Sequence, residues 1–416
     1  MRNARKQEKR MGGVKVLPIF LLSSFKPIPQ FRAAPVAIFF PSVEMKTRVS
    51  LLVLLLAVAV SRSIPRADAA DLAGLDLRAW IRPSPLTARF EDPDYYVWCG
   101  TMVRDDAGKC HLFYSRWKRH LGFDAWVSHS EIAHAVSDNP LGPYHPKDVA
   151  LAPRGKEFWD GLCTHDPTVV RFGSKFYLYY MGDTADHYMG DAPDPAVMKM
   201  QRWVHRNNQR VGVAVADSPD GPWKRMDRPL VEPTPGFFDA LCCNDATVTA
   251  RPGGGYIMVY KAVGDKGPLP FGGPVVLIAA TSDSPSGPFK KQPEPVFAKE
   301  GVKFAAEDPF IWSDDKRCWA IIKDQGGYYT DQGGKGKSLV LFESSDGLQW
   351  KLAEHPFITT PEVTWADGRR QKLAQLERPQ IWLKNGLPAI LFCAADETPD
   401  RSRSFNLQIP LKMPGK

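Results

Sequence analysis

The sequence predicts an all-β fold, a five-bladed β-propeller over residues 70–416 with four-stranded blades, closed by a strand from its N-terminal end. Three observations predict it. A strand–turn–strand unit recurs five times, a third apolar run follows every copy, and the last copy ends one strand short. A β-sandwich is the alternative, but it does not account for five repeats of one four-part unit.

The recurring unit is a hairpin of two apolar runs around a polar turn. Its copies begin at Trp98, Asp166, Asp245, Glu307 and Glu377. In each copy β-branched and aromatic residues flank a turn that contains Gly, Asn or Asp, as in "DPTVVRFGSKFYLYYMG". This composition is typical of a β-hairpin. We therefore expect each copy to supply the first two strands of a blade.

The remaining strands follow each hairpin. The third apolar runs begin at Ser130, Gln209, Pro274, Lys337 and Ser404. After the first four of them comes a turn such as "SPDGPW" and a short outer run such as "PLVEP" or "PFITT". The fifth unit runs out of chain after its third strand. We expect the segment "PLTARF" at Pro85 to complete it, which closes the ring and leaves no exposed inner edge.

The first 69 residues do not have the pattern of a folded domain. We interpret residues 1–44, which are basic and rich in proline, as a disordered extension upstream of the true start at Met45. Residues 45–69 read as a secretory signal peptide, with a basic start, an apolar core and the small-residue site "ADA". The apolar core is about half of the roughly 20 residues that span a bilayer. This predicts a secreted or periplasmic protein without a stable membrane anchor.

Charge and cysteine content exclude several classes. Residues 1–69 hold 12 of the 54 Lys and Arg and 3 of the 46 Asp and Glu, so residues 70–416 carry a net charge of −1 and predict no nucleic acid partner. The seven cysteines form no CxxC pair, which argues against structural zinc. A disulfide between Cys163 and Cys242 or Cys243 stays open.

The ring architecture gathers acidic residues. The first strand of every blade lines the axis, so the residues that begin these strands converge at one end. They are the region Asp94 to Gly100, His165-Asp166, Asn244-Asp245, Glu307-Asp308 and Glu377-Arg378. Crowded carboxylates have their pKa values pushed apart. Glycoside hydrolysis needs such a separation, because one carboxyl donates a proton while another stays charged.

The chain resembles the five-bladed propeller glycoside hydrolases of families 43 and 117 over nearly all of residues 70–416, through motifs such as "NDATV" and "AEDPF". In family 43 an Asp base, a pKa-tuning Asp and a Glu acid lie on the first, third and fourth blades. The resemblance implies that Asp245 tunes the pKa, that Glu307 is the acid, and that the reaction inverts the anomeric centre. Cys99-Gly100 replaces the expected Asp-Pro of the first blade. We assign the base to Asp94, with Asp92 and Asp166 as alternatives.

Other residues are candidates for contacts with an oligosaccharide or polysaccharide of plant or algal origin. We assign substrate binding to Trp98, Arg116, Trp126, His165, Asp166, Arg210, Lys261 and Glu377. The insertion at 182–209 could cap a pocket, which favours exo action. An α-L-arabinofuranosidase, a β-xylosidase and an anhydrogalactosidase are all compatible. No cofactor is expected to be required and no metal ligand is assigned, although calcium in the channel, as in some family 43 relatives, is compatible with the sequence.

Two rival functions remain. A glycoside phosphorylase shares the fold and needs a basic cluster in place of the base, which Arg116 and Arg210 could supply. A non-catalytic carbohydrate-binding propeller is the other, because a fold alone does not fix a function.

Overall fold

The computed structural model describes residues 72–186, 188, 190 and 195–414. The predictions for residues 1–44 and 45–69 lie outside this range. The described residues form a five-bladed propeller, as predicted, in which each blade is a four-stranded antiparallel sheet. Among these residues, no helix has both the length and the apolar character needed to cross a membrane.

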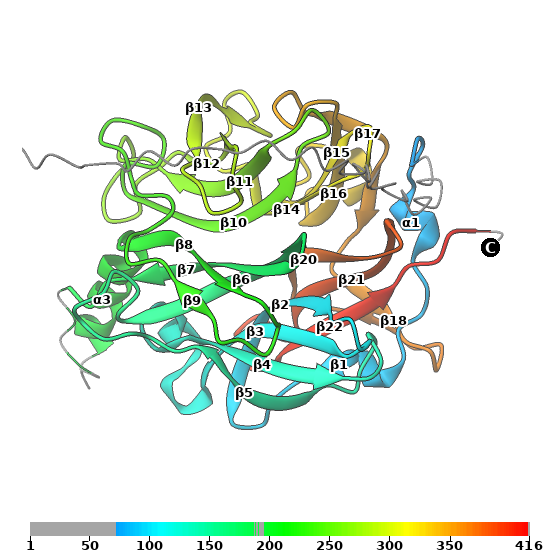
Figure 1. Ribbon diagram of the computed structural model, residues 1–416, viewed down its shortest axis with the longest axis horizontal. Helices are drawn as coiled ribbons and strands as arrows, with labels where there is room; N and C mark the ends of the chain where they lie inside the picture. Colours follow the sequence, from blue (N-terminus) through cyan, green and yellow to red (C-terminus); the bar gives the residue numbers. More distant parts are fainter. Residues whose placement is uncertain (1–71, 187, 189, 191–194, 415–416) are drawn as a thin grey trace, which may run out of the picture. The chain divides into compact units, whose positions relative to one another are not determined.

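The first three blades follow the predicted repeat. Blade I contains β2 (Tyr95–Arg104), β3 (Cys110–Lys118), β4 (Glu131–Ser137) and β5 (His145–Leu151). Blade II contains β6 (Cys163–Phe172), β7 (Lys175–Asp183), β8 (Gln209–Ala216) and β9 (Lys224–Arg225). Blade III contains β10 (Cys242–Ala250), β11 (Tyr256–Val263), β12 (Val275–Ser282) and β13 (Lys290–Val296). In each blade the first strand is the innermost and the fourth is the outermost, as Figure 1 shows for β10 and β13.

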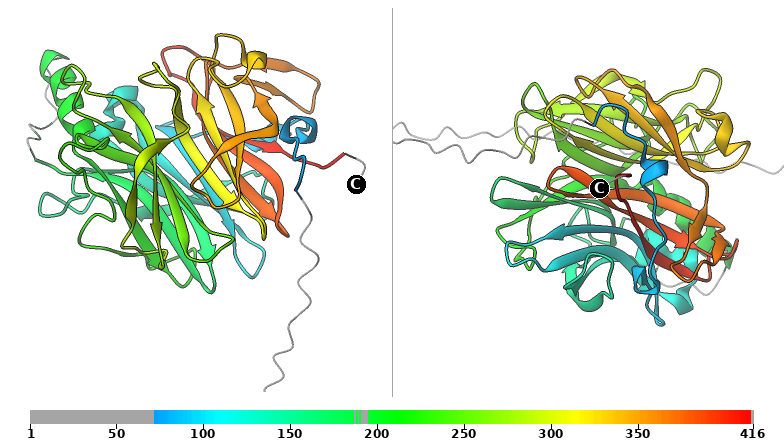
Figure 2. Two further views of the ribbon diagram at one scale, coloured as in Figure 1. Left: turned by 90° about the horizontal axis from the view of Figure 1, so that it is seen from above. Right: turned by 90° about the vertical axis from the view of Figure 1, so that its right-hand side faces the viewer.

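The last two blades complete the ring. Blade IV contains β14 (Ala306–Ser313), β15 (Cys318–Asp324), β16 (Ser338–Ser344) and β17 (Lys351–Thr359). Blade V contains β20 (Gln375–Lys384), β21 (Leu387–Asp396), β22 (Ser404–Pro410) and β1 (Arg89–Phe90). The predicted closure is therefore confirmed: Arg89 pairs with Leu407 and Phe90 with Asn406. Figure 2 shows the segment of α1 (Leu77–Trp80) beside the last strands, where the amide of Arg82 donates to the carbonyl of Pro410 (2.9 Å).

Side chains join neighbouring inner strands to one another. Thr101 Oγ1 on β2 accepts a hydrogen bond from the amide of Val169 on β6 (3.2 Å). Thr247 Oγ1 on β10 accepts one from the amide of Ile311 on β14 (3.2 Å). Gln380 on β20 donates to Thr168 on β6 (3.2 Å), across the axis of the propeller. These bonds fill the middle of the hub with satisfied polar groups, so the hub is a packed core with a site at its end.

Several connections were not anticipated from the repeat. In blade II we expected the segment "PLVEP" to be the outer strand. The outer strand is instead β9, which lies before this segment in the chain, and within "PLVEP" only Val231 forms a β-bridge to β8. The insertion at 182–209 contains α3 (Pro195–Asn207), whose Trp203 meets Phe271 edge to face with ring centres 5.8 Å apart. The other short elements are α2 (Trp126–His129), β18 (Glu362–Thr364), β19 (Arg370–Lys372), η1 (Leu86–Ala88), η2 (Arg119–Leu121), η3 (Phe123–Ala125) and η4 (Asp331–Gly333).

The blades pack on one another through aliphatic and aromatic side chains. All seven cysteines are buried as free thiols, so the disulfide considered between Cys163 and Cys242 or Cys243 does not form.

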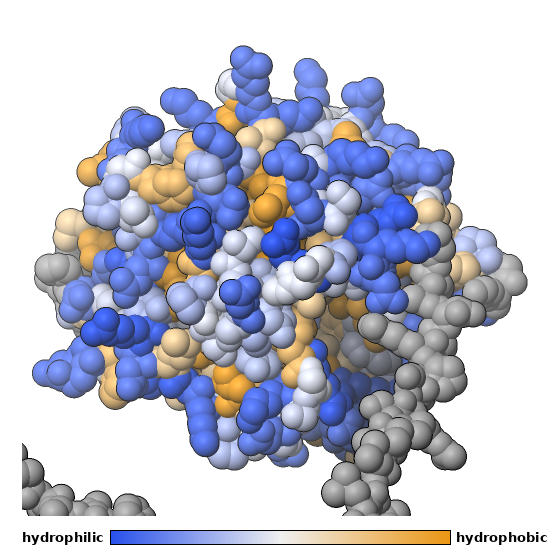
Figure 3. Space-filling model, turned by 45° about the horizontal axis from the view of Figure 1, so that its top comes forward, coloured by the Kyte–Doolittle hydropathy of each residue, from blue (hydrophilic) through white to orange (hydrophobic). Residues whose placement is uncertain are grey.

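The face drawn in Figure 3 is mostly hydrophilic, with hydrophobic residues scattered over it. Scattered apolar residues are normal on a protein surface and indicate no docking patch on this face.

Candidate active site at the hub

Each inner strand contains the same backbone irregularity near its start. The register with the second strand shifts by one residue there, which is a β-bulge. At each bulge a residue other than glycine adopts a positive φ between 52° and 56°; these five hub residues are Cys99, Asp166, Asp245, Asp308 and Arg378. Aspartate is enriched in this left-handed region, because its short polar side chain tolerates it. Bulges re-aim side chains beside active sites. Five blades thus present one side chain each to the same end of the axis.

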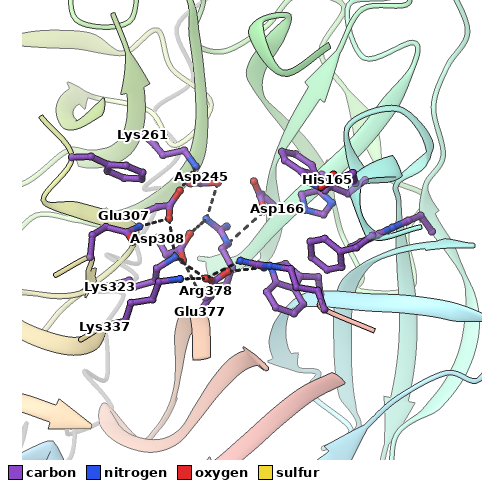
Figure 4. Close-up of a pocket in the computed structure, with 18 of the residues that line it drawn as sticks. His165, Asp166, Asp245, Lys261, Glu307, Asp308, Lys323, Lys337, Glu377 and Arg378 are labelled. Atoms are coloured by element: carbon purple, nitrogen blue, oxygen red, sulfur yellow. Dashed lines mark hydrogen bonds and ion pairs between the residues drawn. The ribbon is translucent and has the colours of Figure 1, made fainter. Parts of the chain in front are cut away.

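Four of the hub residues, Asp166, Asp245, Asp308 and Arg378, line a cavity of about 320 Å³ together with their neighbours. Figure 4 shows the charged side chains of its floor. The lining residues are Trp98, Trp117, Phe123, Asp124, Trp126, His165, Asp166, Arg202, Asp245, Lys261, Phe304, Glu307, Asp308, Lys323, Gln325, Lys337, Glu377, Arg378 and Arg401. Six of them are acidic and six are Lys or Arg, so every carboxylate has a cation within the same cavity.

Two lysines hold Glu307 from opposite sides. Lys261 Nζ lies 2.8 Å from one carboxylate oxygen of Glu307, and Lys323 Nζ lies 2.8 Å from the other. Lys261 also contacts Asp245 at 2.6 Å, and Lys323 contacts Glu377 at 2.9 Å. Gln325 donates a further hydrogen bond to Glu307. Because Lys323 is buried and Lys261 is largely buried, their charges act at short range with little solvent screening.

Arg378 organises the opposite side of the floor. Its guanidinium lies 3.0 Å from Asp245, 3.5 Å from Asp166 and 3.7 Å from Asp308. The side chain of Arg378 is 4 % exposed. Cys99 donates its thiol proton to Asp166 over a distance of 2.9 Å. The three aspartates share Arg378, and two of them also have a lysine nearby: Lys261 contacts Asp245 at 2.6 Å and Lys323 lies 3.5 Å from Asp308. Glu307 has two ammonium groups at 2.8 Å.

This unequal distribution of cations separates the pKa values of the carboxyls. Burial opposes ionisation of Glu307, but Lys261 and Lys323 outweigh it and hold the pKa of Glu307 well below its usual range. Burial likewise opposes ionisation of Glu377, whose pKa Lys323 and Arg401 lower to about 2. Burial raises the pKa of Asp245 to about 7, and the nearby Asp166 adds to this rise. Lys261 opposes it but does not cancel it. Burial raises the pKa of Asp308 to about 6.

These charges conflict with the expected roles of two residues. A general acid must carry a proton near neutral pH, and Glu307 is held in its ionised form by two ammonium groups. The residue expected to tune Glu307, Asp245, is the carboxyl whose pKa lies near neutrality. Asp245 is therefore better suited than Glu307 to carry a proton near neutral pH.

Eight of the eleven residues assigned from the sequence line the cavity. They are Trp98, Trp126, His165, Asp166, Asp245, Lys261, Glu307 and Glu377. Asp94 does not line it and is exposed, just before β2. It precedes the hub residue Cys99 by five positions in an extended segment, which places it roughly 16 Å away along the strand. The residue to which we assigned the base therefore lies apart from the hub carboxylates.

The two arginines assigned to the substrate also lie outside the cavity. Arg116 pairs with Glu131 at 2.9 Å and covers the ring of Tyr95. Arg210 donates to the backbone carbonyls of Asn207 and Gln209. Both side chains are therefore engaged in local contacts outside the cavity. The basic cluster that a phosphorylase would require does not form from these residues.

Sequence reasoning did not assign several lining residues. Asp308 and Arg378 immediately follow Glu307 and Glu377, so the repeat contained the signal for both. Others come from connections that the repeat does not predict, including Asp124 and Arg202, which form an ion pair at 2.6 Å. Because Arg202 belongs to α3, the helix of the insertion lies beside the cavity, as a cap requires.

Aromatic side chains form one wall of the cavity. The ring of Phe123 meets those of Trp98 and Trp117 edge to face, with centres 5.4 and 5.2 Å apart. Trp126 lies over His165 with ring centres 4.9 Å apart. Burial lowers the pKa of His165 to about 3, so its imidazole is neutral at physiological pH. A neutral, aromatic wall opposite a charged floor suits a ring with one apolar face and several hydroxyls.

A calcium ion in the channel would need oxygen ligands. Asp245, Glu307 and Asp308 each offer an oxygen within 4.8 Å of the others. However, Lys261 Nζ contacts Asp245 and Glu307, and Lys323 Nζ contacts Glu307 and lies 3.5 Å from Asp308. The ammonium groups already neutralise these carboxylates. This part of the hub therefore does not fit calcium.

Comparison with known proteins identifies the fold. No family model and no curated protein matches the chain. Solved structures do: Zg3597, a family 117 glycoside hydrolase from Zobellia galactanivorans, is 18% identical, with 80% of this chain and 89% of that chain covered and a TM-score of 0.53. A thermostable family-43 glycoside hydrolase is 13% identical over 80% and 96%, with a TM-score of 0.51. An alpha-L-arabinofuranosidase from Lactobacillus brevis is 11% identical over 82% and 95%, with a TM-score of 0.50. At these identities the likeness shows the shared five-bladed fold alone.

Proposed function

We propose that this chain is a glycoside hydrolase that removes a terminal residue from an oligosaccharide in an inverting reaction. The observation that carries the proposal is the split of pKa values within one aromatic-walled cavity. Asp245 has a pKa of about 7, whereas Glu307, which lies within 4.8 Å of it, is held ionised by two lysines. Two carboxyls in different protonation states are the requirement of glycoside hydrolysis.

The charges assign the two carboxyl roles. The Asp166–Asp245 pair holds one proton and donates it to the leaving glycosidic oxygen. Glu307 stays ionised and accepts a proton from the attacking water. Asp166 belongs to blade II and Glu307 to blade IV, with Asp245 of blade III between them (Figure 4). Inversion requires about 6.5–9.5 Å between acid and base. Oxygens of Asp245 and Glu307 lie within 4.8 Å of each other, so an inverting reaction needs these two side chains to move apart when the substrate binds.

The remaining features concern the substrate and the compartment. A cavity of about 320 Å³ takes one sugar ring better than a chain, which supports exo action. Trp98 and Trp126 stack on the sugar, while His165, Lys261 and Glu377 bind its hydroxyls. The signal-like segment at 45–69 directs the protein to a secreted or periplasmic location. Arabinofuranosides, xylosides and anhydrogalactosides form the first substrate panel, because solved structures of this fold include an alpha-L-arabinofuranosidase.

The function is tested by incubating the protein with aryl glycosides and with plant and algal oligosaccharides, and by following the released sugar by NMR. We expect one terminal residue per cleavage, with its anomeric configuration inverted. Binding without turnover across the panel would favour the carbohydrate-binding propeller. Turnover only with added inorganic phosphate would favour the phosphorylase.

The roles are tested with leaving groups of different basicity. An aryl glycoside with a good leaving group needs no proton donor. Asp245→Asn should therefore lose at least about 100-fold more activity on a phenyl glycoside than on a 2,4-dinitrophenyl glycoside. Glu307→Gln should lose activity equally on both and recover with azide, which replaces the activated water. The reverse pattern would restore Glu307 as the acid.

A further inference from the structure

A second cluster of functional side chains lies away from the hub cavity, between blades I and II. His111 on β3 and His134 on β4 are 2 % and 1 % exposed. His111 Nδ1 lies 2.9 Å from His134 Nε2, and it also lies 3.4 Å from a carboxylate oxygen of Asp220. Asp220 belongs to the connection between β8 and β9 of blade II. None of the three residues lines the hub cavity.

The outer nitrogen of each imidazole faces a carboxylate. His134 Nδ1 lies 3.0 Å from Asp148, and His111 Nε2 lies 3.4 Å from Asp105. A carboxylate in this position accepts the N–H of a neutral imidazole and so fixes the tautomer. The two inner nitrogens lie 2.9 Å apart, at hydrogen-bond distance, so one of them donates a proton to the other. A divalent cation that replaces this proton would meet a lone pair on each of the two nitrogens.

From this arrangement we propose that His111, His134 and Asp220 form a binding site for a divalent transition metal, with Zn²⁺ as the best match. His111 Nδ1, His134 Nε2 and one oxygen of Asp220 are the protein ligands, and water completes a tetrahedron. Two imidazoles with one carboxylate are a ligand set that zinc accepts. Asp105 and Asp148 act as the outer carboxylates that orient metal-bound histidines and raise their basicity.

The distances require a small adjustment. Nitrogen and oxygen ligands about 2.0–2.1 Å from zinc stand about 3.3 Å apart in a tetrahedron. The separation of 3.4 Å between His111 Nδ1 and Asp220 already has this value. The two histidine nitrogens must separate by about 0.4 Å, and their lone pairs must turn toward a common point, which rotation about the two Cβ–Cγ bonds can supply.

The charges around the site favour a cation. Asp105, Asp148 and Asp220 approach the two imidazoles from blades I and II. The cation among them is Lys147, whose Nζ lies 2.6 Å from Asp220. The side chain of Lys147 is 40 % exposed, so it can leave Asp220 for solvent at small cost when a metal binds. Such a metal links two strands of blade I to a turn of blade II. Its role is therefore structural, and the inference does not depend on the proposed hydrolase activity.

The experiment uses the purified full chain without a histidine tag, stripped with EDTA and dialysed. Titration with ZnCl₂ by calorimetry should show one equivalent bound, and Co²⁺ should give the visible d–d bands of a tetrahedral site. Asp220→Asn should weaken zinc binding by at least about 10-fold, because it replaces a charged ligand with a neutral amide. Zinc should raise the melting temperature of the wild type and leave that of Asp220→Asn unchanged.

The matched control is Asp217→Asn. Asp217 is another exposed acid in the same connection, but it pairs with Lys175 and not with either histidine. This variant should bind zinc within about twofold of the wild type. Because Asp220 lies at the surface, its variant should fold even if histidine variants do not. Absence of zinc binding, or equal binding by Asp220→Asn, would overturn the proposal and leave the histidines as a pair that shares a proton.

Discussion

The two ends of the hub differ although the same five strands form both. At one end four of the five hub residues, Asp166, Asp245, Asp308 and Arg378, bring charged groups to the axis, and the fifth is the thiol of Cys99. Three positions further along each strand, the other end of the hub is lined by Met102, Val169, Val248, Ile311 and Ile381. All five of these aliphatic side chains are buried.

The bulge explains this difference. Side chains in a strand alternate between its two faces, and the bulge interrupts this alternation once. A polar residue can therefore face the axis while the apolar residues that follow keep their positions. Between the two ends Thr101, Thr168, Thr247 and Gln380 bond to one another or to neighbouring backbone. The buried charges of the hub are thus confined to one end, and the other end supports the ring by packing. The following predictions compare the two ends directly.

The largest contrast in activity should come from two positions of β10. Asp245→Asn should lower kcat/KM by at least about 1,000-fold, because the Asp166–Asp245 pair loses the proton that it donates. Val248→Ala, at the apolar end, should leave kcat/KM within about twofold. Steady-state kinetics on one aryl glycoside measures both. Comparable losses in the two variants would mean that Asp245 acts through stability.

The largest contrast in stability should come from β20. Arg378→Met should cost about 3–5 kcal/mol, because it leaves Asp166, Asp245 and Asp308 buried without their shared cation. Ile381→Val, at the apolar end, should cost about 0.5–1.5 kcal/mol. Urea unfolding at pH 7 measures both. The deficit of Arg378→Met should shrink as pH falls below about 6, where Asp245 and Asp308 are protonated. A deficit that does not change with pH would contradict this account.

A smaller effect is expected on the pH profile of Lys261→Met. Lys261 lowers the pKa of both Glu307 and Asp245, so its removal should raise both values. Glu307 must be ionised and the Asp166–Asp245 pair protonated, so both limbs of the kcat/KM profile should move to higher pH. We expect a loss of about tenfold at pH 6. Lys337→Met is the control, because Lys337 contacts Glu377 at 3.4 Å and does not contact Glu307 or Asp245. Unmoved limbs in Lys261→Met would exclude these roles.

The smallest effect should follow from substitution of the hub residue of blade I. Cys99→Ser retains a donor toward Asp166 and should change kcat by less than about threefold. Cys99→Ala removes the donor and should move the alkaline limb of the profile, because the hydrogen bond orients Asp166 beside Asp245. Activity assays across pH distinguish the two variants. Equal profiles would show that the thiol fills space only.

The sequence alone was sufficient for the fold and for most of the candidate site. Five hairpins, each followed by a third apolar run, defined the blades and the convergence of the residues that begin the inner strands. The missing last strand of the fifth unit predicted the closure by β1. These features are local or repeated, so periodicity reveals them. The same repeat pointed to Asp166, Asp245 and Glu307, which do meet in one cavity.

Tertiary structure alone decided the charges and the details of the hub. Which carboxyl is ionised depends on Lys261, Lys323 and Arg378, each of which has a partner on another blade. The exclusion of Asp94 likewise followed from the bulge at Cys99, which sets the residue that faces the axis. Electrostatic interactions depend on distance and burial, and a sequence contains neither for residues that meet only when the ring closes.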